Sequence, residues 1–165
     1  MWNRVNQIPR DVQREIRGLF VPTVSRTFTV RPAPEVVVPY LADFGHAEQW
    51  DPGTENCTRI GTGPIQVGTS WLNTSKIAGI STQLTYTLEE LTDRRIVLVG
   101  RNETAESTET IEVSPDGSGS RITYINDVDF HGVAKLAAPA AKLIFEKLGR
   151  DTEQQLTQTL NGLAD

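Results

Sequence analysis

The sequence predicts an α+β domain in which a curved antiparallel sheet of six to seven strands wraps around a long C-terminal helix. Stretches that alternate between apolar and polar residues follow one another from about residue 55 to residue 130. Short turns rich in glycine, proline and aspartate separate these stretches, and connections of this length join antiparallel neighbours. The tail over 133–163 instead has apolar residues at three- and four-residue spacing, which is typical of an amphipathic helix.

The part of the chain before this region predicts one strand followed by two short helices. Residues 24–30 alternate between apolar and polar, which indicates a strand, and Pro32 and Pro34 end it. Helical spacing of apolar residues then indicates a short helix over 35–44 and a further helical turn over 46–50.

The remaining strands follow in a simple order, and the helix closes the fold. They are expected over about residues 55–60, 69–77, 81–91, 94–102, 104–114 and 120–130. Pro139 should kink the C-terminal helix or start it afresh, because proline lacks a backbone donor. A sheet with one apolar face must cover that face, and this helix is the only element large enough. A curved sheet does not close tightly on a straight helix, so a cavity between them is expected.

Residues 1–22 are expected to form an N-terminal extension, and residues 23–165 the folded domain. Val12 and Ile16 lie four residues apart on the apolar side of a short amphipathic helix over about 9–19. This helix could pack on its own domain, on a membrane surface or on a second subunit. A homodimer through the extension is therefore one arrangement that the sequence leaves open.

Charge and composition exclude several classes of function. The chain of 165 residues has a net charge of −5 and no clustered basic face, which argues against binding to nucleic acid. It has no run of about 18 apolar residues, so no transmembrane segment is expected. Cys57 is the single cysteine, which fits a reducing compartment and a cytoplasmic location. Neither a phosphate-binding loop nor a metal-ligand motif is present, so we expect no cofactor and no metal.

The chain resembles the START-like, or SRPBCC, superfamily, which includes the polyketide cyclase/dehydrase and lipid-transport group. Three segments carry the resemblance, which extends over residues 23–163: Tyr40-Leu41-Ala42-Asp43-Phe44, Trp50-Asp51-Pro52-Gly53 and Gly63-Pro64-Ile65-Gln66-Val67-Gly68-Thr69. The resemblance implies a helix-grip fold whose deep cavity holds a lipid, a polyketide or another small hydrophobic molecule. It does not imply one reaction, because transporters, sensors and cyclases share this fold.

Polar residues at inward strand positions are the best candidates for a site. Glu109 and Ser107 share a predicted face with Ile111, and Asn126 lies on the apolar face of the next strand. A buried carboxyl group is unfavourable unless it is paired, hydrated or protonated, and a cavity could supply water or a ligand. A register slip of one residue would turn each of these side chains outward.

Aromatic residues and the long helix complete the predicted cavity wall, although ordinary core packing explains each aromatic residue equally well. The predicted ligand-binding residues are Trp50, Trp71, Tyr86, Ser107, Glu109, Tyr124, Asn126, Ala140 and Ile144.

Two classes of function remain open. The first is a binding protein that carries or senses a small hydrophobic ligand, and the absence of a catalytic motif favours it. The second is a polyketide cyclase or dehydratase, in which Glu109 with Tyr86 or Tyr124 would perform acid–base chemistry in a water-poor pocket. A third, a partner-binding subunit with a vestigial cavity, receives less support.

Overall fold

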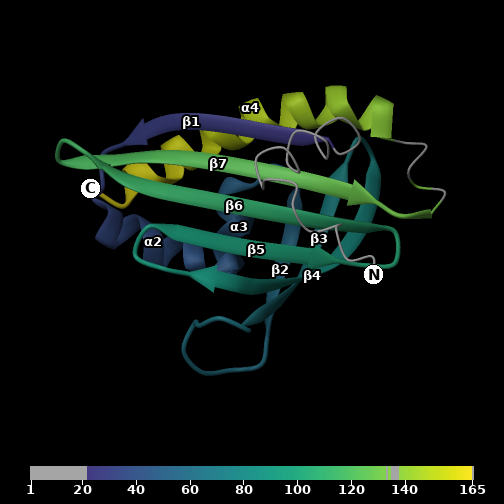
Figure 1. Cartoon of the computed structure of the whole chain (residues 1–165), viewed down its shortest axis with the longest axis horizontal. Helices are drawn as coiled ribbons and strands as arrows, with labels where there is room; N and C mark the ends of the chain where they lie inside the picture. Colours follow the sequence, from purple (N-terminus) through teal and green to yellow (C-terminus); the bar gives the residue numbers. More distant parts are fainter. Residues whose placement is uncertain (1–21, 133, 135–137, 165) are drawn as a thin grey trace, which may run out of the picture.

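A single sheet of seven antiparallel strands forms the frame of the protein. The structure, a computed structural model, describes residues 22–132, 134 and 138–164. The strands are β1 (Thr23–Val30), β2 (Thr54–Ile60), β3 (Ser70–Ile77), β4 (Ile80–Leu91), β5 (Arg95–Arg101), β6 (Ala105–Asp116) and β7 (Gly119–Phe130). Their order across the sheet is β1-β7-β6-β5-β4-β3-β2. The predicted fold class is confirmed, and Figure 1 shows the curvature of the sheet.

The helices lie on one face of this sheet (Figure 1). They are α2 (Pro34–Ala42), a 3-10 turn (Phe44–His46), α3 (Ala47–Trp50) and α4 (Ala138–Gly162). The prediction of two short helices after the first strand is confirmed. The predicted helix over 9–19, and with it the proposed dimer contact, lies outside the described residues. Most of the first turn of the helix expected from residue 133 also lies outside the described residues.

The alternation read from the sequence places one face of each strand in the interior. Leu84, Tyr86 and Leu88 of β4 are all buried, as are Ile122 and Tyr124 of β7. Since the side-chain period of a strand is two, burial of one face fixes the register of the whole sheet.

The hydrophobic core occupies only one end of the space between sheet and helices. Phe44, Trp50 and Trp71 are almost fully buried there, together with Leu156 and Leu160 from the second half of α4. The side chain of Trp71 is fixed by a hydrogen bond from its Nε1 to Asp43 Oδ1 at 3.2 Å. The core therefore packs against the C-terminal half of α4, and the first half of this helix covers a different part of the sheet.

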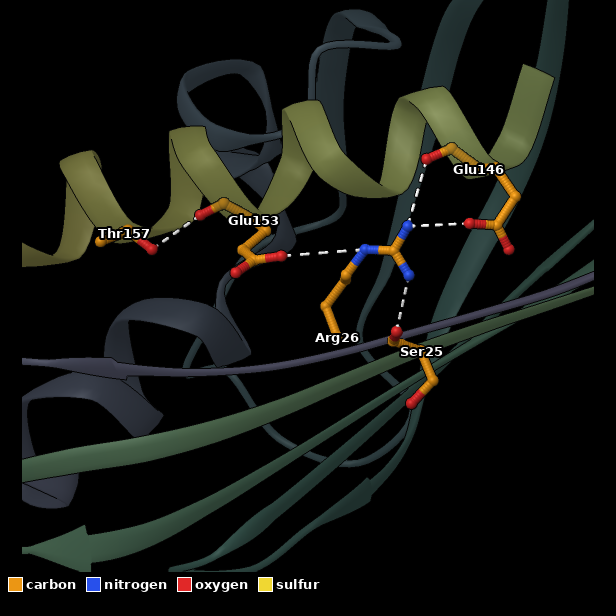
Figure 2. A network of polar contacts seen from close by, with 5 residues as sticks. All are labelled: Ser25, Arg26, Glu146, Glu153 and Thr157. Atoms are coloured by element: carbon orange, nitrogen blue, oxygen red, sulfur yellow. Dashed lines mark hydrogen bonds and ion pairs between the residues drawn. The ribbon is translucent and has the colours of Figure 1, made fainter. Parts of the chain in front are cut away.

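Polar contacts attach the middle of α4 to the edge strand β1. Figure 2 shows Arg26 of β1 reaching across to the helix. Its Nη2 donates to the Oε2 of Glu146 at 3.0 Å and to the carbonyl oxygen of Glu146 at 3.2 Å. Its Nε lies 3.8 Å from Glu153 Oε2. Gly149 lies between these two glutamates, and a Cβ added there would come within 2.3 Å of Val24 Cγ1. Glycine thus permits the close approach of helix and strand.

Candidate functional site

A cavity of about 460 Å³ lies between the sheet and the first half of α4. The inward faces of β1, β3, β4, β6 and β7 form its walls, and α4 from Ala140 to Thr152 covers it. Most of these residues are apolar, with a few polar groups among them. This composition is typical of a small-molecule site.

Glu109 is the most unusual polar residue of the cavity wall. It lies on the inward face of β6 with 4% of its surface exposed. Its Oε2 is buried and has no hydrogen-bond partner among the described residues. Burial raises the pKa of Glu109 to about 8, the negative charge of Asp51 adds to this rise, and the nearby Tyr86 and Tyr124 hydroxyls oppose it. At neutral pH this carboxyl group is therefore mostly protonated.

Asp51 is the second carboxyl group of the cavity wall and is held by its own turn. The backbone N–H of Gly53 donates to Oδ1 at 3.1 Å, and the hydroxyl of Thr54 donates to Oδ2 at 2.6 Å. Asn73 donates to the same hydroxyl, which directs the hydroxyl proton toward Asp51. Burial raises the pKa of Asp51, whereas these hydrogen bonds lower it.

Tyr86 and Tyr124 bring their rings to the cavity from β4 and β7. Burial, and then the charge of Glu109, raises the pKa of both phenols well above the ordinary value, so both stay neutral. Gly100 lies opposite Tyr86 on β5. A Cβ at this position would come within 2.6 Å of the tyrosine ring, so the glycine makes room for it.

Ser107 and Asn126 extend the polar side of the wall. Asn126 pairs with Glu109 across the β6–β7 ladder, as the short hairpin between these strands suggests. Its Nδ2 donates to Ser107 Oγ at 3.1 Å. One cluster of polar groups therefore occupies three neighbouring inward positions of β6 and β7, with Tyr86 and Asp51 beside it. Further hydroxyl groups line the cavity elsewhere, on Ser75, Thr82, Thr104 and Thr152.

The structure places some of the predicted ligand-binding residues in the cavity wall and others in the core. Those that line the cavity are Tyr86, Ser107, Glu109, Tyr124, Asn126, Ala140 and Ile144. Trp50 and Trp71 do not line it, because both have no exposed surface and belong to the core at the other end of α4. Ile144 is at the margin of the cavity, with 36% of its surface exposed.

Sequence reasoning missed two residues that shape the site. Asp51 was noticed within the Trp-Asp-Pro segment, but nothing in the sequence places it beside Glu109. Gly100 carries no motif, and its role depends on its cross-strand partner. A glycine inside a strand is the one signal that could have been followed, since it often marks a close approach.

The described part of the chain offers neither a metal site nor a membrane-spanning helix. No group of three or more His, Cys, Asp or Glu residues is arranged there to hold a metal ion. None of the described helices is long and apolar enough to cross a membrane.

Comparisons with known proteins agree with this architecture. The family model described as polyketide cyclase / dehydrase and lipid transport matches residues 21–164. The START superfamily protein from Mycobacterium smegmatis is 16% identical, with a TM-score of 0.71, over 86% of this chain and 98% of that chain. The Zhui aromatase/cyclase from Streptomyces sp. R1128 is 14% identical, with a TM-score of 0.74, over 88% and 96%. No curated protein matches the sequence. At these identities the structural likeness shows the fold alone.

Proposed function

The chain belongs to the polyketide cyclase/dehydrase and lipid transport family, and from this premise we propose that it binds a small hydrophobic ligand in the cavity under α4, as a carrier or sensor. The observation that carries the proposal is the cavity itself. It has a volume of about 460 Å³ and a largely apolar wall that includes a smaller number of polar residues.

The division of α4 supports this proposal. Leu156 and Leu160 in its second half are fully buried in the core. Ala141 and Leu148 in its first half line the cavity instead. A helix used only for stability would bury its apolar stripe along its whole length. Here, half of the stripe is left for a ligand.

Filling the cavity tests the proposal. Ala141 is buried and lines the cavity, so Ala141→Trp should occupy ligand space. Leu143 is 79% exposed on the same helix, which makes Leu143→Trp a matched control. We expect the fluorescent neutral probe 1-pyrenemethanol to bind the native protein and L143W with micromolar affinity, about −8 kcal/mol. A141W should bind it at least about tenfold more weakly. Equal binding by both variants would place the probe elsewhere, and circular dichroism would confirm that both are folded.

An enzymatic role is the second candidate, and Glu109 is the observation that favours it. A carboxyl group kept protonated at neutral pH by burial can act as a general acid, and two neutral phenols lie beside it. The two functions differ in what mass spectrometry would detect after incubation with a poly-β-ketone analogue. A binding protein would release it unchanged, whereas a cyclase or dehydratase would release a product that has lost water, more slowly in Glu109→Gln.

A further inference from the structure

The ionisable groups of the cavity wall are all acidic. Among the described residues that line it, those that titrate are Asp51, Glu109, Tyr86 and Tyr124, and there is no lysine, arginine or histidine. An anionic ligand would therefore meet negative charge, with no compensating cation among the described residues of the wall. This arrangement disfavours free fatty acids and other carboxylates, because a buried charge needs an opposite partner.

The two carboxyl groups, Asp51 and Glu109, differ in the hydrogen bonds that they accept. Both oxygens of Asp51 already accept hydrogen bonds from Gly53 and Thr54. Among the described residues, the buried Oε2 of Glu109 has no hydrogen-bond partner, although almost all buried polar groups in folded proteins have one. The wall thus contains one carboxyl group whose two oxygens already accept hydrogen bonds and one whose Oε2 still lacks a partner.

Aromatic rings surround the same space. Tyr86 and Tyr124 lie beside Glu109, and Phe130 and Phe145 also line the cavity. Phe130 and Phe145 have their ring centroids 6.5 Å apart. Aromatic faces together with carboxylates form the surroundings that attract organic cations, through the quadrupole of the rings and through charge.

We propose that the cavity takes a hydrophobic ligand that carries a protonated amine, with the ammonium group next to the carboxyl group of Glu109 and in the field of Asp51. This inference rests on the proposed binding function and specifies the chemical class of its ligand. The apolar part of the molecule lies against the aliphatic and aromatic wall under α4.

An ammonium group fits this wall better than a neutral acceptor does. A ligand carbonyl could accept a hydrogen bond from protonated Glu109, but it would leave the charge of Asp51 uncompensated. An ammonium group donates to Glu109 and also balances the negative charge. It also offsets the two effects that raise the pKa of Glu109, first its burial away from water and then the negative charge of Asp51.

Proton release follows from this arrangement. When an ammonium ion binds beside it, Glu109 ionises and its proton passes to the buffer. Three other titrating groups near Glu109 keep their protons at neutral pH. Tyr86 and Tyr124 stay neutral, and burial raises the pKa of Cys57 on β2 to about 12. The residues of α4 that line the cavity contribute no charged side chain.

Three probes with one ring system test the inference: 1-pyrenemethylamine, 1-pyrenemethanol and 1-pyrenecarboxylate. Fluorescence titration at pH 7 gives their dissociation constants. Calorimetry of the amine in two buffers of different ionisation enthalpy gives the protons released. We expect the amine to bind about tenfold or more tightly than the alcohol, the carboxylate to bind weakest, and the amine to release about one proton per molecule bound.

The variant Glu109→Gln tests whether Glu109 is the group that releases the proton and prefers the amine. It should abolish proton release and bring the affinities for amine and alcohol close together. The control Glu112→Gln lies on the same strand, but its side chain is exposed and paired with Arg95. It should keep both properties, and thermal unfolding verifies that each variant is folded.

The outcomes separate the inference from the proposed function. Alcohol or carboxylate binding as tightly as the amine would overturn the inference and leave the binding function intact. Amine binding without proton release, or with release unchanged in E109Q, would also overturn it. Failure of all three probes to bind would overturn both.

Discussion

Replacing Glu109 by glutamine should stabilise the protein in alkaline solution and change its stability little near pH 5. Burial raises the pKa of Glu109 to about 8, against an ordinary value of 4.5. Between these two values the folded protein keeps a proton that the unfolded chain has released. The free energy of unfolding of the native protein therefore falls as pH rises through this window and stays lower above pH 8. Glutamine has nearly the same shape and does not titrate, so the variant lacks this decline.

The structure sets the size of the effect. Each pKa unit corresponds to about 1.4 kcal/mol, so the difference between pH 5 and pH 9 would be on the order of 4 kcal/mol for a group wholly shielded from water. Water entering the cavity lowers the desolvation of the carboxylate, and we therefore expect about 2–4 kcal/mol.

Urea unfolding of the native protein and of E109Q at pH 5, 7 and 9 measures this difference. The free energy of unfolding of E109Q minus that of the native protein should grow steadily across the three pH values. Glu112→Gln, on the exposed side of β6, should show no such trend above pH 5. A difference that stays constant from pH 5 to pH 9 would mean that Glu109 titrates like an exposed glutamate, and the argument from burial would be refuted.

Two further predictions concern α4. Gly149→Ala should destabilise the protein by about 1–3 kcal/mol in urea unfolding, because the added methyl group would lie 2.3 Å from Val24 Cγ1. Gly162→Ala is the control: its added methyl group would have no atom of the described residues within 4 Å. This variant should leave the free energy of unfolding unchanged or raise it. Leu156→Ala should lower the free energy of unfolding by about 2–5 kcal/mol, since this side chain is fully buried. Ile144→Ala, at a position 36% exposed, should lower it by less than about 1 kcal/mol. Equal losses at both sites would contradict the division of α4 into a half that packs in the core and a half that covers the cavity.

The order of the strands along the chain and their inward faces could be predicted, because both depend on local sequence pattern. Tyr124 and Asn126 alternate with outward residues in the sequence, and the structure places both on the wall of the cavity. The pairing of Glu109 with Asn126 also follows from short-range information, since a tight hairpin between β6 and β7 fixes their register.

The position of a residue along the inward face could not be predicted in the same way. Trp50 and Trp71 were expected in the cavity wall, and the periodicity that turns Trp71 inward is correct. Core and cavity share that face, however, and they differ only in how far along the sheet they lie. Which end is filled depends on where α2, α3 and the second half of α4 pack, and these are contacts between distant segments.

The closeness of Asp51 and Glu109 could not be predicted for the same reason, and it matters most for function. The two residues are far apart in the sequence, and each has a local reason for its place: a turn closed by Thr54 for one, and strand alternation for the other. Only the curvature of the sheet brings the turn after α3 near the inward face of β6.

The electrostatic property of the site therefore belongs to neither segment. It arises because the fold buries both carboxyl groups beside one cavity, where the charge of Asp51 raises the pKa of Glu109. A substitution that filled this space with a side chain would remove ligand binding and further desolvate Glu109. For this reason Ala141→Trp should also steepen the loss of stability between pH 5 and pH 9, by shielding the carboxyl group from the remaining water. Urea unfolding of that variant at the two pH values measures this coupling, and a pH dependence equal to that of Leu143→Trp would show that cavity and carboxyl group are independent.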